Sequence, residues 1–359
     1  MKRFEPQVVW IDRDELDTPI ARAVRGRFRG PIELFSGSAP IGRRSVQDGK
    51  RMLVLQRHRG GFLRHCPAGT AGLVCCNYLV VNLASNCPMD CSYCFLQDYL
   101  ADAPALTAYT NVGEALAEID AVLRAHPERR FRIGTGELSD SLALDPLTDL
   151  SAHLVPFFAA RPNALLELKT KTDCVDALLD LDPCERVVVS WSVNAPTVTA
   201  ADELGTATLA ERLAAARLVQ ARGYLLGFHL DPLVELDGWE HEYASLVEAI
   251  AAAVDADRVA WFSLGSLRVS PPLAQAMAGR AAVGPVAAAE MVPGADGKAR
   301  VWRGLRLRMY RTIVERLREA FPRAPLYLCM ETADVWDQVM GEVPSDRGLG
   351  MRLAAGRAW

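Results

Sequence analysis

Three cysteines in one short stretch could together hold an inorganic cluster. Cys87, Cys91 and Cys94 stand four and then three residues apart, after an apolar run. Thiolates at this spacing can converge on one iron–sulfur cluster, because a loop of this length lets each side chain turn inward. Zinc is the competing interpretation, but its structural sites use four ligands, usually two paired motifs, and no second pair completes a tetrahedron here. Three cysteines on a four-iron cube leave one iron open to a substrate or a second cofactor.

Apolar runs and helical patterns alternate around this stretch. Strands are predicted at 78–83, 130–133, 165–168, 186–191, 224–230, 259–264 and 326–330, and helices at 112–126, 147–160, 174–179, 209–221, 239–254 and 305–320. Such alternation implies parallel strands joined by crossover helices. We therefore expect the fold class α/β, as a partial (β/α)6 TIM barrel with N-terminal and C-terminal extensions. Function is expected at the C-terminal ends of the strands.

The pattern also suggests a division of the chain. We expect residues 1–76 to form an N-terminal extension that packs on the barrel, with a strand at Gln7–Ile11. The barrel core is expected at 77–265, and a C-terminal region with a basic segment and the last helix and strand at 266–359. The segment 271–299 lacks clear periodicity and is predicted to be an insertion or loop.

The composition narrows the class of protein. Half of the 359 residues are apolar, so a large core is easily supplied. No apolar run is long enough to span a membrane, and Met1–Gln7 lacks the apolar region of a signal peptide, so we expect a cytoplasmic protein with no membrane partner. The net charge of −4 argues against nonspecific coating of nucleic acid but permits a local basic groove. Nine cysteines in such a chain favour metal or redox chemistry over disulfides.

The cysteine pattern, with Tyr93 just before the last cysteine, resembles the signature of the radical S-adenosylmethionine (radical SAM) superfamily. In that superfamily the open iron chelates the amino and carboxylate groups of SAM, and an electron cleaves SAM to a 5′-deoxyadenosyl radical. The resemblance implies a [4Fe–4S] cluster and SAM as cofactors. It also implies an electron donor such as flavodoxin or ferredoxin.

Polar side chains follow several predicted strands. Glu137 ends the run Gly134-Thr-Gly-Glu137, in which the glycines let the backbone approach a ligand and the carboxylate could hold the SAM ammonium. Lys171 could pair with the SAM carboxylate, while Ser192 or Asn194 could bind its sugar or carboxylate. The competing interpretation is an ordinary turn and a solvated lysine. His229 also ends a strand, where a structural hydrogen bond is more common than a ligand bond.

Nearly the whole chain resembles the spore photoproduct lyase family of radical SAM proteins, in its non-sporulating, lyase-like branch. The resemblance rests on Phe4–Ile11, Asn86–Gln97, Tyr109–Glu114, Ser192–Ala195 and Gly223–Phe228. It implies repair of 5-thyminyl-5,6-dihydrothymine, a UV lesion in DNA, by radical hydrogen abstraction and C–C scission, with UV-damaged DNA as a partner. By register, the SAM pocket would be lined by Ser139, Asp140, Lys171, Ser192 and Asn194.

The chain departs from that family at positions that matter for catalysis. Glu137 stands where the family has a cysteine that returns a hydrogen atom to the product radical, and a carboxylate has no weak X–H bond to give. The family has two tyrosines flanking the last cluster cysteine; Tyr93 remains here, but Phe95 takes the second place. Asp231 stands where a small residue is expected. The radical relay is therefore rewired or absent.

Other cysteines could supply the missing hydrogen atom. Cys329 lies at the end of the last predicted strand, and Cys66, Cys75 and Cys76 precede the first barrel strand. Buried structural thiols are the competing interpretation, because cysteine is commonly buried. Ligation of a second metal centre by Cys66, Cys75 and Cys76 is a further alternative. We take Tyr93, Glu137 and Cys329 as the candidate catalytic residues.

A basic, aromatic-interleaved run near the C-terminus is the candidate DNA-binding segment, and it overlaps the DNA-contacting hairpin of the family. Phosphate contacts from such a run fix register on a duplex without reading sequence, and a lesion enzyme must draw its base out of the stack. An exposed arginine-rich helix is the competing interpretation. The residues of the candidate DNA-binding segment are Lys298, Arg300, Trp302, Arg303, Arg306 and Arg308.

Three functions remain open from the sequence. The first is a radical SAM lyase-type enzyme acting on a pyrimidine dimer in DNA. The second is a radical SAM enzyme acting on RNA, a peptide or a small metabolite, which the replacement of the donor cysteine by Glu137 favours somewhat. The third is a noncatalytic iron–sulfur binding or sensing protein. In each case we expect a monomer.

Overall fold

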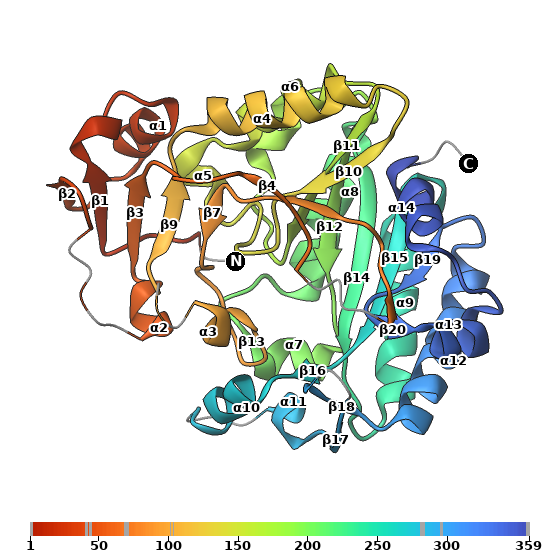
Figure 1. Ribbon diagram of the computed structural model, residues 1–359. Helices are drawn as coiled ribbons and strands as arrows, with labels where there is room; N and C mark the ends of the chain where they lie inside the picture. Colours follow the sequence, from red (N-terminus) through yellow and green to blue (C-terminus); the bar gives the residue numbers. More distant parts are fainter. Residues whose placement is uncertain are drawn as a thin grey trace.

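The computed structural model describes residues 3–39, 42, 45–67, 72–100, 102, 104–280, 284–294 and 297–356. Its main sheet has the strand order β19-β15-β14-β12-β11-β10-β6-β4 and curls into an open half-barrel (Figure 1). All neighbours in it are parallel except β4 and β6. The expected α/β half-barrel is confirmed. Its strands are β4 (Leu63–His65), β6 (Leu79–Val81), β10 (Phe131–Gly134), β11 (Ala164–Thr170), β12 (Val187–Ser192), β14 (Leu225–Leu233), β15 (Val259–Ser266) and β19 (Leu326–Leu328).

Helices connect successive strands and pack on the outer face of the half-barrel (Figure 1). In α4 the buried residues Val112, Ala115, Ile119 and Leu123 follow the i, i+3, i+4 spacing that an amphipathic helix requires. The helix α8 begins with a capping box, in which Thr208 and Glu211 satisfy each other's backbone N–H groups. The main helices are α4 (Val112–Ala125), α6 (Ser151–Ala159), α8 (Leu209–Ala221), α9 (Trp239–Ala253) and α12 (Arg303–Ala320).

A second sheet lies beside the half-barrel, on the left in Figure 1. Its order is β2-β1-β3-β9-β7, and the strand predicted at the N-terminus is its β1. One continuous hydrophobic core extends through both sheets, from Val9 to Leu353. The strands are β1 (Val8–Asp12), β2 (Ile32–Phe35), β3 (Met52–Gln56), β7 (Ala84–Ser85) and β9 (Leu106–Tyr109).

The segment 271–299 is more ordered than predicted. It contains α10 (Pro271–Ala278), α11 (Pro285–Ala288), β17 (Met291–Pro293) and the start of β18 (Ala299–Val301). The strands β17 and β18 join β16 (Arg268–Val269) in a small antiparallel sheet. Elements this short span too few turns or residues to produce a readable hydrophobic period. The expectation of a loop is therefore wrong for the helices and strands described here, and the alternative of an insertion stays a prediction.

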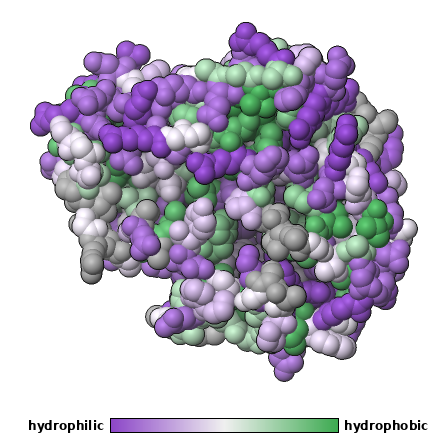
Figure 2. All heavy atoms as spheres, viewed as in Figure 1, coloured by the Kyte–Doolittle hydropathy of each residue, from purple (hydrophilic) through white to green (hydrophobic). Residues whose placement is uncertain are grey.

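Short elements complete the fold, and hydrophilic residues predominate on the face seen in Figure 2, where apolar residues form separate small patches. Among the described residues, no helix has both the length and the apolar character needed to cross a membrane. The remaining elements are η1 (Arg13–Glu15), α1 (Pro19–Arg27), α2 (Val46–Gly49), β5 (Leu73–Val74), β8 (Asp90–Cys91), α3 (Leu96–Tyr99), α5 (Asp145–Thr148), η2 (Asp176–Asp180), α7 (Pro196–Asp202), β13 (Glu203–Leu204), η3 (Ala256–Arg258), β20 (Glu331–Thr332), α13 (Ala333–Met340) and α14 (Asp346–Ala354).

Candidate active site

The cysteine loop connects β7 to β9, just beyond the C-terminal end of β6, the first parallel strand of the half-barrel. Cys91 is buried, and Cys87 and Cys94 are half-buried. Burial raises the pKa of all three thiols, that of Cys87 to about 12. Cys91 interacts electrostatically with both other thiols, and so does Cys94. The three thiols therefore lie close enough to one another to interact, and their role as cluster ligands stays a prediction.

Two lysines lie close to these sulfurs. The charge of Lys50, from the N-terminal part of the chain, lowers the pKa of Cys87 and Cys94, and that of Lys171 lowers the pKa of Cys91 and Cys94, against the larger effect of burial. Both cations favour the thiolate, which is the form of cysteine that binds metal. The surroundings of the three cysteines thus suit a ligand set that must lose its protons.

Among the described residues, no three His, Cys, Asp or Glu side chains are gathered closely enough to hold a single metal ion. A four-iron cluster needs more widely spaced ligands than a single ion, since each cysteine binds a different iron. The loop provides the thiolate donors that such a cluster uses.

Two buried amides close the cysteine loop. Asn86, at φ 67°, accepts a hydrogen bond from the Cys87 N–H at 2.7 Å and donates to the Pro104 carbonyl at 2.6 Å. Gln97 donates to the carbonyls of Ser92 at 2.8 Å and Cys94 at 3.2 Å. Because backbone groups in an irregular loop lack regular partners, these amides supply the hydrogen bonds that fix its path.

Glu203 links two residues that the sequence singled out separately. Its carboxylate accepts a hydrogen bond from Tyr93 and lies 3.2 Å from the Lys171 ammonium and 2.6 Å from Arg212. Burial would raise the pKa of Glu203, but Lys171 and Arg212 lower it to about 2. Tyr93 and Lys171 are therefore brought together, through a carboxylate that no sequence pattern indicated. An acidic residue directly after a helix gave no signal of this contact.

The loop after β10 contains the predicted SAM-binding residues Ser139 and Asp140. Asp140 accepts hydrogen bonds from the N–H groups of Leu142 and Ala143 at 2.9 Å and of Lys171 at 2.7 Å, and from Thr170 Oγ1 at 2.8 Å. Its carboxylate therefore fastens this loop to the end of β11. Its predicted contact with SAM stays a prediction, beside this role in holding the loop.

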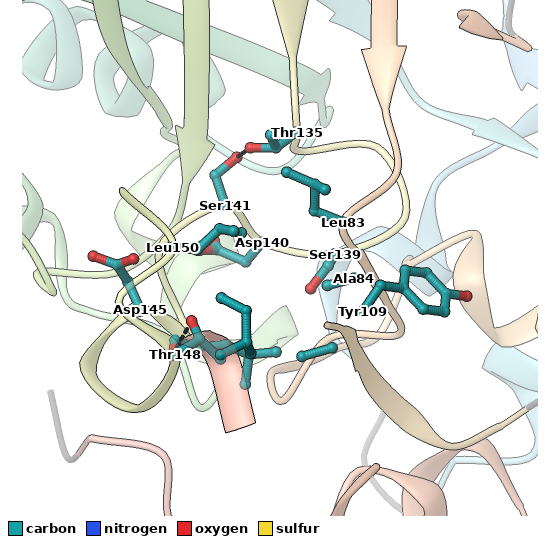
Figure 3. A pocket seen from close by; sticks show the side chains of 13 residues that line it. Leu83, Ala84, Tyr109, Thr135, Ser139, Asp140, Ser141, Asp145, Thr148 and Leu150 are labelled. Carbon is teal, nitrogen blue, oxygen red and sulfur yellow. Dashed lines mark hydrogen bonds between the residues drawn. The ribbon is translucent and has the colours of Figure 1, made fainter. Parts of the chain in front are cut away.

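A pocket next to this loop is lined by Ser139, Asp140, Leu83, Ala84 and Tyr109, among others (Figure 3). The Ser139 hydroxyl is buried and has no hydrogen-bond partner among the described residues. Unpaired buried hydroxyl groups are costly, so a ligand group or a water is expected to meet this one. Ser139 is thus better placed than Asp140 to contact a bound molecule.

The residues predicted at the end of β12 have different surroundings. Asn194 donates to the Pro232 carbonyl at 2.9 Å and accepts from the Ala195 N–H at 2.9 Å and the Tyr243 hydroxyl at 2.7 Å. Its amide ties β12 to β14 and α9, and its predicted contact with SAM stays a prediction. Ser192 is buried nearby, and its carbonyl accepts from Arg212 at 2.7 Å.

A buried ionic network crosses the half-barrel interior. Glu167 on β11 accepts hydrogen bonds from Arg132 on β10 at 2.7 Å, Ser190 on β12 at 2.6 Å and His229 on β14 at 2.7 Å. Burial opposes ionisation of Glu167, but Arg132 and His229 hold its pKa far below the ordinary value. An ionised carboxylate only accepts, so we assign the Nε2 proton to His229 as donor. A sequence signal for this network exists, because Glu167 is a charged residue inside the otherwise largely apolar strand β11.

The protonation of His229 leads to a pH prediction. Burial, with the charge of Lys169, lowers the pKa of His229 from 6.5 to about 4. Between these values the unfolded chain binds a proton that the folded chain excludes, so the free energy of unfolding should fall as the pH drops through this window. His229→Gln keeps a donor for Glu167 but cannot titrate. Denaturant titrations at about pH 7 and about pH 5 should show a smaller loss of stability for this variant than for the wild type; equal losses would contradict the assignment.

A second group of charged residues lies in the half-barrel interior, nearer the C-terminal ends of the strands than the Glu167 network. Asp231 lies 3.3 Å from Arg268, and a Cβ on Gly265 would lie 2.5 Å from its carboxylate, so glycine is needed there. Burial raises the pKa of Glu137, which interacts electrostatically with Lys169 and Asp231. The predicted residue Glu137 is therefore part of a charged layer that Lys169, Asp231 and Arg268 complete.

Cys329 belongs to the same layer. It follows β19, and its thiol interacts electrostatically with Asp231, Arg268 and Lys169. Burial raises the pKa of this thiol well above its ordinary value. Cys76 also interacts with Cys329, and its pKa is raised by burial as well. Both thiols are therefore protonated at neutral pH and face the interior of the half-barrel.

Much of the predicted DNA-binding segment is already engaged within the protein. Arg300 and Arg306 are buried, and Arg306 lies 3.6 Å from Glu331. Arg303 forms an ion pair with Asp334, and Arg308 with Glu240. The amphipathic pattern of α12 explains the difference, because one face of the helix must turn to the core. Trp302, in contrast, is 63% exposed at the start of this helix.

Comparison with known proteins agrees with this architecture. The family model described as spore photoproduct lyase matches residues 74–268. The chain is 29% identical over 259 residues to the spore photoproduct lyase of Bacillus subtilis (strain 168), which covers 71% of this chain and 75% of that protein. It is 28% identical over 260 residues to the spore photoproduct lyase of Geobacillus sp. (strain Y412MC61), and this match covers 71% of this chain and 76% of that protein.

Solved structures show the same fold. A spore photoproduct lyase mutant superposes with a TM-score of 0.79 at 24% identity, covering 91% of this chain and 100% of that chain. Another mutant, with bound AdoMet and dinucleoside spore photoproduct, gives a TM-score of 0.78 at 23% identity, with the same coverage. Because the family model spans more than half of the sequence, this chain belongs to the spore photoproduct lyase family of radical SAM enzymes.

Proposed function

We propose that this chain repairs the spore photoproduct, a thymine dimer in DNA, by radical SAM chemistry. The observation that carries the proposal is the convergence of Cys87, Cys91 and Cys94 beside Lys50 and Lys171, at the C-terminal edge of the half-barrel of a spore photoproduct lyase family member. A barrel strand end is where enzymes of this architecture place their chemistry.

The donor set fits a [4Fe–4S] cluster held by Cys87, Cys91 and Cys94. When bound, the cluster and SAM supply a carbon-centred radical able to abstract a hydrogen atom. The protein's part is to hold and orient these groups. We assign Glu137 to the ammonium group of SAM and Lys171 to its carboxylate. Ser139 and Ser192 are assigned to other polar groups of SAM. Lys171 already lies against Glu203 at 3.2 Å, so its ammonium is preset near the cysteine loop.

The hydrogen atom for the product is assigned to Cys329. Only the protonated thiol can donate a hydrogen atom, and burial keeps this thiol protonated. In that step the S–H bond of Cys329 breaks, a C–H bond forms on the product radical, and a thiyl radical remains on sulfur. Cys76 is the second candidate, since it also faces the interior. Glu137 cannot take this role and is instead assigned to ligand binding.

For DNA contact we assign Trp302, with Lys298 and the outward arginines of α12. Stacking of a base on an exposed aromatic ring contributes about 1–3 kcal/mol. Trp302→Ala is therefore expected to weaken binding of UV-irradiated DNA about tenfold, as measured by fluorescence anisotropy at fixed salt. Leu218→Ala, which removes another exposed apolar side chain, is the control and should bind normally. Unchanged affinity of the Trp302 variant would remove this residue from the DNA-binding surface.

The function itself is tested by product analysis. The anaerobically reconstituted protein, with SAM and dithionite, is incubated with an oligonucleotide that contains the spore photoproduct, and the products are resolved by mass spectrometry. We expect restored thymines and 5′-deoxyadenosine. Formation of 5′-deoxyadenosine with an untouched lesion would assign the chain to another substrate.

A further inference from the structure

The described residues 270–280 and 284–286, which we call the α10–α11 segment, lie beyond the residues that match the family model. They nevertheless contact the cysteine loop, and α10 and α11 lie below α3 and α7 in Figure 1. Its first helix, α10, packs against α3 of that loop, and α11 packs against α7, which leads into β13. The strand β13 in turn pairs with β8, which contains Cys91. The segment thus touches both sides of the loop.

Arg280, just after α10, makes four hydrogen bonds to the cysteine loop. Its guanidinium donates to both carboxylate oxygens of Asp90 at 2.7 and 3.2 Å, to the Asp90 carbonyl at 3.3 Å and to Gln97 Oε1 at 3.2 Å. Paired bonds between guanidinium and carboxylate fix orientation as well as distance. Arg280 is also close enough to Cys91 to interact with it electrostatically.

Two further contacts lie on either side of this one. Ser270 Oγ donates to the Asp98 carboxylate at 2.8 Å. The Val286 N–H donates to Asp202 at 3.2 Å, and the same carboxylate accepts a hydrogen bond from the Ser92 hydroxyl. A Cβ on Gly284 would lie 2.3 Å from Asp202, so the backbone approaches this carboxylate as closely as glycine permits.

The loop is held from its other side by the N-terminal part of the chain. Lys50 donates to the Met89 carbonyl and lies 3.5 Å from Asp90, so Asp90 stands between Lys50 and Arg280. The loop has little regular structure of its own, since β8 is two residues long and α3 is a single turn of four residues. Its order therefore depends on these outside contacts.

We propose that the α10–α11 segment, residues 270–280 and 284–286, clamps the cysteine loop and that Arg280 is its main positioning residue. The proposal rests on the proposed function, because it assumes a cluster on Cys87, Cys91 and Cys94. Groups that orient metal ligands affect affinity strongly even though they do not touch the metal, and their loss costs about 10–100-fold. Arg280 acts in this way through Asp90, and its charge also favours the reduced, more negative cluster.

The test measures the cluster rather than turnover. Wild-type and Arg280→Gln proteins are reconstituted anaerobically, and the rate of iron release to a chelator and the reduction potential of the cluster are recorded. We expect about tenfold faster iron release for Arg280→Gln and a lower potential. Arg280→Lys keeps the positive charge but cannot form the paired hydrogen bonds with Asp90. This variant should have a reduction potential close to that of the wild type, but it should still release iron nearly as fast as Arg280→Gln. Arg323→Gln breaks a surface ion pair with Asp257 and should match the wild type.

The outcomes separate the two proposals. A wild type that takes up no iron contradicts the proposed function. A wild type with iron and an Arg280→Gln protein that releases it at the same rate and potential contradicts the clamp alone. If Arg280→Gln does not fold, Ser270→Ala decides, because it removes a second contact and should accelerate iron release by a smaller factor; an unchanged rate there would overturn the clamp.

Discussion

Replacement of Cys91 by alanine is expected to remove the iron–sulfur cluster and to reduce SAM cleavage to background. The thiol is buried at the end of β8, where pairing with Glu203 fixes its backbone, so no other cysteine can take its place. Loss of one of three thiolates leaves the cluster without its ligand set. A single small truncation costs the fold only about 1 kcal/mol. Iron content and 5′-deoxyadenosine yield are the measurements.

Cys184→Ala is the matched control for that prediction. Cys184 is exposed and lies outside the half-barrel interior, between η2 and β12. Its variant should retain wild-type iron content and SAM cleavage. A Cys91→Ala protein that still cleaved SAM at the wild-type rate would contradict the assignment of the cluster to the cysteine loop.

Replacement of Cys329 by alanine is expected to separate SAM cleavage from repair. The radical would still form and abstract its hydrogen atom, because the cysteine loop and the SAM-binding residues are untouched. The product radical would then lack its donor. We expect the yield of repaired thymine per 5′-deoxyadenosine to fall about tenfold or more, which corresponds to at least about 1.4 kcal/mol of barrier. Mass spectrometry of both products gives this ratio directly.

Isotope incorporation makes this prediction more specific. In D2O the Cys329 thiol exchanges its hydrogen, so the wild type should transfer deuterium to the repaired thymine, and Cys329→Ala should lose this label. Cys174→Ala, which removes a buried thiol in the loop between β11 and η2, is the control and should keep the wild-type label. An unchanged ratio in Cys329→Ala, combined with a loss in Cys76→Ala, would move the donor to Cys76.

The sequence was sufficient for the large elements of the fold and insufficient for the small ones. Strands such as β12 and β14 are long apolar runs bounded by turn residues, and α8 carries its own capping box, so local patterns determine them. The elements α10, α11, β17 and β18 have at most eight residues each. Their positions depend on contacts with the cysteine loop and the barrel, which no local pattern records.

Some residues of the candidate site could likewise be predicted from local sequence patterns, and others could not. The spacing of the three cysteines is a local signal, and in the structure the three thiols are near enough to interact electrostatically. Glu203 and Arg280 act on the loop from 110 or more residues away, so only the folded chain reveals them. Asn194 follows a strand as a ligand-binding residue would, but its amide is used to join two strands. A residue type at a strand end therefore indicates a position near the site, and the hydrogen bonds decide its role.

Electron paramagnetic resonance of the reduced protein, before and after addition of SAM, tests the central claim most directly. Three cysteine ligands leave one iron open, so we expect the signal of a reduced [4Fe–4S] cluster whose g values shift when SAM binds. Metal analysis that finds zinc in the anaerobic protein, or a cluster signal that SAM leaves unchanged, would contradict the assignment of Cys87, Cys91 and Cys94.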